Sequence, residues 1–461
     1  MSAARKQTRG RSERRPPRTG PVRRPKRSSR LRGSPHPNAG QRYDEGFRAG
    51  YEEGVQFGMQ SFGSGFEGTS IIIPTYNQLG KLKLCIASIM EHTHSPYEII
   101  VVDNASTDGT AAYLRTFGGQ VRSRMLDANR GFAGAVNVGL MMAKGSHIVL
   151  LNNDTVVTER WLDNMLACLN SDERIGMVGP VTNYASGEQQ IPVPYDNVRQ
   201  MPRFAAKFNR SDSSRWRRTD RLVGFCLLFR RELFERIGYF DEGFELGNFE
   251  DDDYNIRVRL LGRSLVIAKD TFIHHFGSVS IRALGDRFAQ VNDRNKLYFA
   301  DKWQNPYEWI HRVLQKAEAA GQAQKQLPGM TALYPDRIAV QGIGAGVYWI
   351  EDGKRHPVEG QPLFPVTRVS QVDLKRWPAA APIGAEEAAR RWQGEQTGIV
   401  MLPDGTKYHR EGGCIRRIAS EAAMRMWHFH LKRTDVLQPE DVAAFAEGLP
   451  IVAPPVLRQR L

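Results

Sequence analysis

Acidic, basic and imidazole side chains occur at intervals between residues 100 and 280, and several of them stand close behind short apolar runs. Carboxylate oxygens and imidazole nitrogens bind Mg²⁺ or Mn²⁺, and such an ion also accepts phosphate oxygens. Arginine and helix N-termini oppose the negative charge of phosphate groups. Together these groups predict a site for a metal-bound diphosphate. The residues concerned are Asp103, Arg130, Asp154, Glu250–Asp253 and His274-His275.

The elements that must position these residues alternate between strand-like and helical patterns from Thr69 to about Lys302. The strand-like runs are continuous and rich in Ile and Val, as in parallel strands that are buried on both faces. This predicts an α/β sheet with helices on both faces, in which ligands bind beyond the carboxyl ends of the strands. The strand-like runs are Ser70–Ile73, Glu98–Val102 and His147–Leu151, and the helical stretches are Leu79–His92, Gly109–Phe117 and Ala133–Ala143.

Several other classes of protein are disfavoured. The sequence has no G-x-x-x-x-G-K-[ST] loop and no G-x-G-x-x-G after its first strand, which argues against P-loop hydrolysis and ordinary dinucleotide oxidoreduction. No apolar run reaches the roughly 18 residues of a membrane helix, and no apolar segment follows the basic N-terminus as in a secretory signal. The four cysteines are far apart, which is typical of reduced intracellular thiols, so we expect a cytoplasmic protein.

The positive net charge is concentrated at the N-terminus. The 461 residues carry a formal charge of +14, and residues 1–37 hold thirteen Lys and Arg against one acid. The remainder is close to neutral, so a wholly basic nucleic-acid-binding surface is not implied. Residues 1–42 contain almost no large apolar side chains and are expected to be disordered. One role for such a tail is peripheral contact with an anionic membrane.

The rest of the chain divides into four segments. Residues 43–68 repeat glycine and an aromatic or aliphatic residue at every fourth position, which fits either a self-association helix, with an oligomer formed through residues 43–66, or a flexible linker. Residues 69–314 hold the α/β pattern, and the Gln- and Ala-rich residues 315–330 suggest a linker. Residues 331–461 are expected to form a small accessory module with β-hairpins, and two D-G hairpin signals within it suggest a duplication. The signals are Asp352-Gly353 and Asp404-Gly405.

A series of polar motifs follows the predicted strands in order along the chain. A lone D-x-D motif is weak evidence for a protein family, whereas an ordered series of motifs is strong evidence. From Ser70 to about Trp303 the series resembles a family 2 glycosyltransferase with a GT-A fold, and the bacterial rhamnosyltransferase-like subgroup in particular. The motifs are Pro74–Asn77, Asp103–Gly109, Asn129–Gly134 with Asn137, Asn152–Asp154, Gly224–Glu242, Glu250–Asp253 and His275–Ser280.

The resemblance implies a metal-dependent, inverting transfer of a sugar from a UDP- or dTDP-linked donor to a hydroxyl acceptor. The metal, Mn²⁺ or Mg²⁺, would be held by Asp154 and His275, with His274 as the less favoured ligand. Asp251 would be the catalytic base. Asn152 stands where the family often has an acid. The donor would be bound by Pro74, Tyr76, Asn77 and Asp103 at the nucleotide base, and elsewhere by Asn129, Arg130, Gly131, Asn137, Asn152, Asn153, Gly224 and Glu250.

The acceptor implied by the resemblance is a saccharide, a lipid-linked glycan or a protein, in the synthesis of a bacterial surface polysaccharide or glycoprotein glycan. No specific nucleic acid is expected as a partner.

Two other functions fit parts of the sequence: a nucleic-acid- or anionic-surface-binding protein that depends on the basic tail, and a non-catalytic carbohydrate-binding scaffold. Some polar residues also have structural interpretations. Asp108-Gly109 is interpreted as a turn and helix cap, Asp253 as the ion-pair partner of Arg257, and Asp252 as mainly structural.

Overall fold

The computed structural model describes residues 65–277, 286–319, 327–394 and 397–459. These described residues belong to one compact unit. The predicted basic tail (1–42) and almost all of the glycine-patterned segment (43–68) lie outside the described residues, so both remain predictions. In the described part of the chain, no helix is both long enough and apolar enough to span a bilayer.

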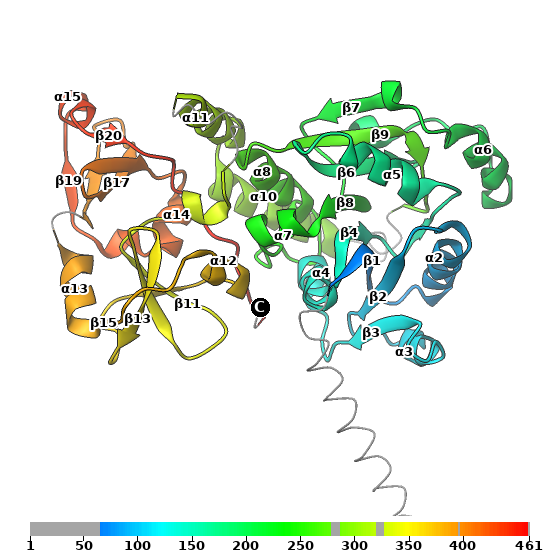
Figure 1. The fold of residues 1–461 in the computed structure, drawn as a ribbon, viewed down its shortest axis with the longest axis horizontal. Coiled ribbons are helices and arrows are strands. Elements are labelled where there is room, and N and C mark those ends of the chain that lie inside the picture. The colour runs from blue at the N-terminus through cyan, green and yellow to red at the C-terminus, as the bar shows by residue number, and fades with distance from the viewer. Residues whose placement is uncertain (1–64, 278–285, 320–326, 395–396, 460–461) are drawn as a thin grey trace, which may run out of the picture. The chain divides into compact units, whose positions relative to one another are not determined.

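Strands and helices alternate through the first part of this unit, and the predicted elements recur with similar bounds (Figure 1). The strands are β1 (Phe66–Thr75), β2 (Tyr97–Asp103), β3 (Val121–Met125), β4 (Gly145–Leu151), β5 (Thr155–Val156), β6 (Ile175–Val181), β7 (Trp216–Thr219), β8 (Cys226–Arg230), β9 (Ser264–Phe272) and β10 (His274–His275). The helices are α2 (Leu79–His92), α3 (Thr110–Arg115), α4 (Gly131–Met142), α5 (Trp161–Asn170), α6 (Met201–Phe208), α7 (Arg231–Ile237), α8 (Glu250–Leu260), α10 (Asp286–Trp303) and α11 (Pro306–Ala319), with a short 3₁₀ helix η1 (Gly187–Gln189) after β6.

An eight-stranded sheet, with strand order β3-β2-β1-β4-β8-β6-β9-β7, forms the centre of this part. The first four strands in that order are parallel, as the continuous apolar runs predicted. β8 runs antiparallel to β4 and β6, and β7 runs antiparallel to β9, so the sheet is mixed. The carboxyl ends of β1, β2 and β4 therefore meet at one edge of the sheet, where the predicted site residues lie.

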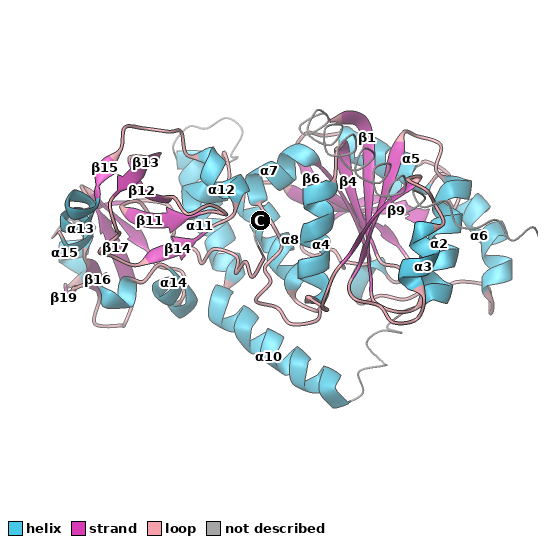
Figure 2. Ribbon diagram, turned by 90° about the horizontal axis from the view of Figure 1, so that it is seen from below, coloured by secondary structure: helices cyan, strands magenta, loops and turns pink. Residues whose placement is uncertain are grey.

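Helices cover both faces of this sheet (Figure 2). Buried residues of α4, α7 and α8 share one core with Ile72 and Leu150 of the sheet. On the other face, α2 and α5 share a core with Ile71 and Val149. Successive side chains of a strand point to opposite faces, so Ile71 and Ile72 enter different cores. The predicted α/β class is thus confirmed.

Two five-stranded sheets follow in the accessory module, and both have the same topology. Their orders are β14-β11-β12-β13-β15 and β19-β16-β17-β18-β20, with antiparallel and parallel pairings at equivalent places. This repetition supports the predicted duplication. The strands are β11 (Ile338–Gln341), β12 (Val347–Glu351), β13 (Lys354–Glu359), β14 (Val366–Arg368), β15 (Ile383–Gly384), β16 (Ile399–Met401), β17 (Lys407–Glu411), β18 (Cys414–Arg417), β19 (Thr434–Val436) and β20 (Ala446–Glu447), and the helices are α12 (Gln371–Arg376), α13 (Ala385–Gln393), α14 (Glu421–Met426) and α15 (Pro439–Ala443).

The two D-G signals both mark hairpin turns, but not equivalent ones. Asp352-Gly353 joins β12 to β13, whereas Asp404-Gly405 lies between β16 and β17, which correspond to β11 and β12. The segment predicted as a linker (315–330) begins inside a helix, because α11 continues to Ala319.

The end of the accessory module lies against the α/β domain. The N–H of Glu242 donates to the Val456 carbonyl oxygen at 2.9 Å, and the N–H of Arg458 donates to the Glu242 carboxylate at 2.7 Å. Trp303 and Trp427 belong to one continuous buried core. The accessory module is therefore part of the same folded unit as the site.

Candidate functional site

The loops after β1 and β2 are joined by hydrogen bonds. The N–H of Asn77 donates to Ser106 Oγ at 2.7 Å, and Asn77 Oδ1 accepts from the N–H of Thr107 at 2.9 Å. Asp103 is buried and accepts from the N–H of Ser106 at 3.0 Å. Asn77 has a φ of 55°, a left-handed conformation that asparagine tolerates better than most residues. The predicted Pro74–Asn77 turn and Asp103 are thus brought together, and Tyr76 of that turn is 43% exposed.

A second loop, at the start of α4, is tied to the same place through Asn104. Asn104 Nδ2 donates to Asn129 Oδ1 at 2.9 Å and to the Gly131 carbonyl oxygen at 3.0 Å. Its Oδ1 accepts from the N–H of Arg130 at 2.8 Å. Three predicted residues therefore lie beside the β2 loop, and the residue that fixes them was not among the predicted ones. Asn104 lies within the Asp103–Gly109 motif, but the motif alone does not indicate which of its residues contacts the loop before α4.

Arg130 points toward the C-terminal segment. Its guanidinium donates to Asp127 Oδ1 at 2.7 Å and to Gln459 Oε1 at 2.9 Å. Gln459 in turn donates to the Gly134 carbonyl oxygen and to Glu242. The last described residue of the accessory module thus contacts a predicted phosphate-binding side chain, a contact that no local sequence pattern could indicate.

Asn137 does not line a cleft in this structure. Its side chain is fully buried, donates to the Phe240 carbonyl oxygen and to Glu242 Oε1, and accepts from the N–H of Phe240. These bonds hold α4 against the segment between α7 and α8. The Asn137 amide therefore stabilises the packing of α4 rather than lining the site, because this position of α4 faces the core.

The end of β4 brings two predicted metal ligands together. Asp154 and His275 are both buried, and His275 Nε2 lies 3.2 Å from Asp154 Oδ1. Strand β10, which carries His275, pairs with β5 directly after Asp154. Asn153 donates to Thr75 Oγ1 at 2.7 Å and so joins this strand end to that of β1. Asn152 lies before them at the strand end, partly buried.

The orientation of the His275 ring is fixed by a hydrogen bond of its other nitrogen, Nδ1. Nδ1 lies 2.8 Å from the carbonyl oxygen of Tyr184, and because a carbonyl oxygen can only accept, Nδ1 must carry the proton. Phe225 stacks on the ring with a centroid separation of 5.3 Å. Asn183 also brackets the His275 backbone with two hydrogen bonds. Nε2 is thus held facing the Asp154 carboxylate, the arrangement in which a histidine binds a metal.

His274 faces away from Asp154 and contacts Tyr195, whose hydroxyl oxygen is 2.8 Å from His274 Nδ1. Burial lowers the pKa of His274 to about 4, with the charges of His275 and Lys81 acting in the same direction. Lys81 of α2 lies over the Phe276 ring, 3.1 Å from its centre. Burial lowers the pKa of Lys81, while the Asp154 carboxylate opposes that shift, so a cationic side chain borders the pair.

Asp154 and His275 fit a metal ion that takes only part of its ligands from the protein, rather than an ion that protein side chains surround completely. Within the described ranges, no group of three or more His, Cys, Asp and Glu side chains could hold an ion. One carboxylate and one imidazole leave most positions of a Mg²⁺ or Mn²⁺ ion to water and phosphate oxygens. This donor set suits an ion that arrives with a diphosphate.

Asp251 lies at the second position of α8, beside Gly224. Its Oδ2 accepts from the N–H of Gly224 at 2.8 Å, and its Oδ1 accepts from the N–H of Asp252 at 2.9 Å. A Cβ at Gly224 would lie 3.1 Å from the Asp251 Cβ, so the close approach depends on glycine. Burial, and then the charge of Asp252, raises the pKa of Asp251 to about 6, while Arg221 opposes the shift. Such a carboxylate is ionised at neutral pH yet more basic than usual, as a general base requires.

Glu250 is also buried, and its Oε2 has no hydrogen-bond partner among the described residues. Burial, with the negative charge of Asp251, raises its pKa well above the usual value. Asp252 instead reaches the surface, where Arg221 Nε lies 2.5 Å from its Oδ1. The neighbouring acids thus have three different environments, as expected when side chains leave a helix at about 100° steps.

The predicted ion pair of Asp253 and Arg257 is confirmed, with Nε 2.9 Å from Oδ2. Lys302 of α10 adds to it and lies 2.6 Å from both Asp253 and Asp241. These side chains are fully buried, and burial works to raise the pKa of Asp253, but Lys302 and Arg257 outweigh it and lower that pKa. This buried network holds the start of α8, and with it Asp251, against α10.

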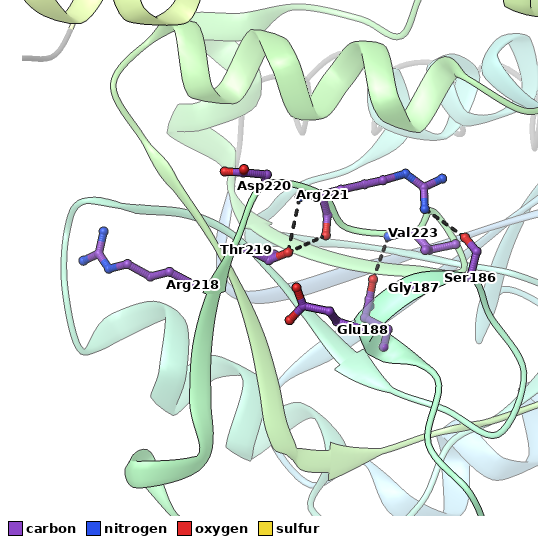
Figure 3. Close-up of a pocket in the computed structure, with 9 residues that line it drawn as sticks. Ser186, Gly187, Glu188, Arg218, Thr219, Asp220, Arg221 and Val223 are labelled. Carbon is purple, nitrogen blue, oxygen red and sulfur yellow. Dashed lines mark hydrogen bonds between the residues drawn. The ribbon is translucent and has the colours of Figure 1, made fainter. Parts of the chain in front are cut away.

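A pocket of about 420 Å³ has two walls, and none of Asp154, His275 and Asp251 lines it (Figure 3). Residues 186–189 form one wall, and they follow Tyr184, which holds His275. The segment 218–223 forms the other wall and leads into Gly224, which holds Asp251. Arg221 joins the walls by donating to Ser186 Oγ at 2.8 Å, and the N–H of Val223 donates to Gln189 Oε1 at 2.7 Å.

Comparison with known proteins finds similarity to one family of enzymes. Residues 70–238 match the family model for glycosyl transferase family 2. The chain is 25% identical over 278 residues to an N-acetylglucosaminyl-diphospho-decaprenol L-rhamnosyltransferase of Mycobacterium tuberculosis, which covers 52% of this chain and 88% of the relative. It is 26% identical over 221 residues to a chondroitin synthase of Pasteurella multocida, covering 41% of this chain and 23% of that synthase.

Among solved structures, a mannosyltransferase from Pyrobaculum calidifontis in complex with GDP-Man and Mn²⁺ aligns with a TM-score of 0.36 and 22% identity, covering 56% of this chain and 78% of that one. The chain spans only about a quarter of the length of the chondroitin synthase, whereas it spans most of the rhamnosyltransferase.

Proposed function

Residues 70–238 are a family 2 glycosyltransferase domain, and from this premise we propose that the chain is a metal-dependent, inverting glycosyltransferase. It would move a sugar from a nucleoside diphosphate donor to a hydroxyl acceptor. The observation that carries the proposal is that the proposed metal ligands and the proposed base meet at Gly224 and Phe225. The Phe225 ring stacks on His275, which faces Asp154, and the N–H of Gly224 donates to Asp251.

The donor would lie along the carboxyl ends of β1, β2 and β4. The Pro74–Asn77 turn and Asp103 would hold the base, and the loop of Asn129 and Arg130 would lie beside the phosphates. Asn152, Asn153, Gly131, Gly224 and Glu250 complete the proposed donor contacts. Asp154 and His275 would hold Mn²⁺ or Mg²⁺, which when bound neutralises the charge of the leaving diphosphate. Supporting this placement, the loops concerned are already joined through Asn77 and Asn104.

Asp251 would take the proton of the acceptor hydroxyl as the oxygen attacks the anomeric carbon from the face opposite the diphosphate. Attack from that face inverts the configuration of the sugar. Supporting this role, Asp251 is held by two backbone N–H groups and has a pKa of about 6, so it is ionised where an enzyme of neutral pH would work.

The biological setting proposed here is the synthesis of a surface polysaccharide or glycoprotein glycan. The similar proteins named above include a rhamnosyltransferase whose name specifies a lipid diphosphate acceptor and a polysaccharide synthase. By analogy with them, we expect a UDP- or dTDP-linked donor and a saccharide or lipid-linked acceptor. Contact of the basic tail with an anionic membrane would bring the chain to such an acceptor.

Release of nucleoside diphosphate from UDP- and dTDP-linked sugars, measured with Mn²⁺ and with simple glycosides as acceptors, tests the proposal. We expect release by the wild type with one donor class and loss of release in Asp154→Ala. Asp293→Ala, which removes an exposed carboxylate of α10, is the matched control and should keep wild-type activity. Metal-independent release, or full activity of Asp154→Ala, would contradict the proposal.

A further inference from the structure

We propose that a second pocket, formed around α6 by residues 194–215, binds the phosphate end of a lipid. Cationic side chains at its rim would take the phosphate group, and aromatic rings at its floor would take the first carbons of the apolar chain. A prenyl diphosphate and a membrane phospholipid share this chemistry. Binding at this α6 pocket needs neither a nucleotide nor a metal ion, so the inference does not rest on the proposed sugar transfer.

Helix α6 separates apolar from cationic side chains, because residues four positions apart share a face of a helix. One face is buried, the next carries two half-buried phenylalanines, and the third carries two exposed cations. These pairs are Met201 and Ala205, Phe204 and Phe208, and Arg203 and Lys207. Figures 1 and 2 both show α6 at the periphery of the α/β part. The two cations are therefore open to solvent beside an apolar strip.

Aromatic rings form the floor of the α6 pocket, whose volume is about 650 Å³. Tyr195, Phe204 and Phe208 line it, and their ring centres lie 5.0–6.3 Å from that of Phe272 in β9. The Phe204 ring is tilted by 55° to Tyr195 and by 40° to Phe208. Rings at such angles offer an apolar surface, rather than the flat platforms on which nucleobases stack.

Three cations surround this floor, and no acidic side chain lines the α6 pocket. Arg203 and Lys207 form no ion pair with any residue that the structure describes. Arg215 donates to the carbonyl oxygen of Phe208 at 3.1 Å, and its guanidinium lies over the Phe208 ring, 4.3 Å from the ring centre. The charge of Arg215 is thus held at the floor, while those of Arg203 and Lys207 stand at the rim.

The acids closest along the chain compensate this charge only in part. Asp212 accepts from the N–H and the hydroxyl of Ser214 at 3.0 and 2.6 Å. These bonds, with the charge of Arg215 acting in the same direction, lower the pKa of Asp212. Residues 194–215 contain five Lys and Arg against two acids, Asp196 and Asp212, which gives 5 − 2 = +3. An anionic ligand is therefore favoured, and Arg203 and Lys207 are the cations left for it.

A cationic rim beside an apolar floor matches an amphiphile in which phosphate is joined directly to an apolar chain. Inorganic phosphate would leave the aromatic floor unused, and a neutral apolar molecule would leave the cations unused. Two further exposed cations, Arg199 and Arg210, flank α6 in the sequence. They extend the positive charge along the surface that an anionic lipid head group would approach. The observations together favour a lipid phosphate over a soluble phosphate.

Titration calorimetry on the full chain, in EDTA and about 150 mM salt, tests this inference with soluble probes. The probes are geranyl diphosphate, dihexanoyl phosphatidic acid, inorganic pyrophosphate and hexathymidylate. We expect at least one of the two lipids to bind about tenfold or more tightly than pyrophosphate, because only the lipids bury apolar carbons. The lipid that binds more tightly identifies the source, a prenyl carrier or a membrane phospholipid.

Charge reversal at the rim shows whether the probes bind in this pocket. Arg203→Glu with Lys207→Glu should weaken binding of that lipid by about tenfold or more. Arg203→Lys with Lys207→Arg should keep the affinity within about threefold, because both charges remain. The matched control is Lys83→Glu with Lys296→Glu, which reverses two exposed lysines of α2 and α10 and makes the same change in net charge. Its affinity should also stay within about threefold of the wild type. Since residues 1–37 are the same in every variant, their contribution cancels in these comparisons.

Four results would overturn the inference: no binding of either lipid, pyrophosphate bound as tightly as both lipids, equal losses in the rim variant and its matched control, or a loss confined to hexathymidylate. The last result would assign the α6 pocket to a nucleic acid. Circular dichroism should show the same fold in all variants, because the substituted side chains are exposed. Arg203→Glu with Lys207→Glu should also keep metal-dependent release of nucleoside diphosphate with simple glycosides. Failure of the lipid site and failure of the proposed function are thus measured separately.

Discussion

His275 Nε2 faces the Asp154 carboxylate at 3.2 Å while the other nitrogen of the same ring donates to a backbone carbonyl oxygen. The two residues are far apart in sequence and come together because β10 pairs with β5 immediately after Asp154. An imidazole held in this way has only Nε2 available for a cation. The neighbouring His274 faces Tyr195 instead, so the two adjacent histidines have different environments.

This difference predicts opposite effects of two substitutions. His275→Ala should lower the affinity for UDP in the presence of Mn²⁺ by about tenfold or more, because it removes one of the two proposed protein ligands. His274→Phe should change that affinity less than about threefold. Titration calorimetry with and without Mn²⁺ would measure both, and loss of metal dependence in His274→Phe rather than in His275→Ala would exchange their assignments.

A second prediction concerns turnover at the acidic start of α8. Asp251→Asn should keep the fold and the affinity for the donor but lower turnover by about 10²–10⁴-fold, the effect of a lost general base. Asp252→Asn should stay within a few-fold of the wild type, because Asp252 lies at the surface and pairs with Arg221. Steady-state kinetics would decide, and the reverse result would show that the base is a different member of the acidic cluster.

The pH dependence of kcat/KM should report the same carboxylate. Asp251 with a pKa of about 6 must lose its proton to act, so kcat/KM should fall as the pH drops below about 6. Asp252→Asn should move this midpoint to lower pH, because it removes a negative charge that raises the pKa of Asp251 and leaves the opposing charge of Arg221. An unchanged midpoint in Asp252→Asn would mean that another group limits the rate.

Glu250 should make stability depend on pH. Because its pKa is raised in the folded chain, the folded state binds a proton that the unfolded state releases above about pH 4.5, so the free energy of unfolding falls as the pH rises through that range. Glu250→Gln should remove this fall in the free energy of unfolding. It should raise the free energy of unfolding by about 1–3 kcal/mol at pH 7.5 and by less near pH 4.5. Urea unfolding at both pH values would measure it. Glu91→Gln on the exposed face of α2 should show no such difference.

Much of the fold could be predicted from the sequence because its signal is local. Uninterrupted runs such as Ile71–Ile73 and Ile99–Val102 indicate buried strands, and the helix predicted at Leu79–His92 has those bounds. The direction of β8 could not be predicted in this way. The run of apolar residues in β8 resembles that of a parallel strand, and its antiparallel pairing with β4 depends on the path of the chain between them.

In the site, too, local features could be predicted from the sequence, whereas contacts between distant residues could not. The position of Asp154 at a strand end is local, but its pairing with His275 was expected only from the family resemblance. The contacts of Asn104, Arg221 and Gln459 join residues that are distant in sequence, so no local pattern indicates them. Asn137 was predicted to line the nucleotide cleft because it belongs to a motif. It is buried instead, because its face of α4 packs against the core.

Lys302 should be the most important single side chain for holding α8 in place. Its ammonium lies 2.6 Å from the carboxylates of Asp241 and Asp253, and all three side chains are fully buried. Lys302→Met would leave two buried carboxylates with Arg257 as the remaining cation, and removing one partner of such a group typically costs about 3–5 kcal/mol. Lys296→Met, at an exposed position of the same helix, should change the free energy of unfolding by less than about 0.5 kcal/mol. Adding Asp241→Asn to Lys302→Met should recover part of the loss, because it removes one of the unpaired charges. If urea unfolding gave equal stabilities for Lys302→Met and Lys296→Met, the buried network would not be what positions Asp251.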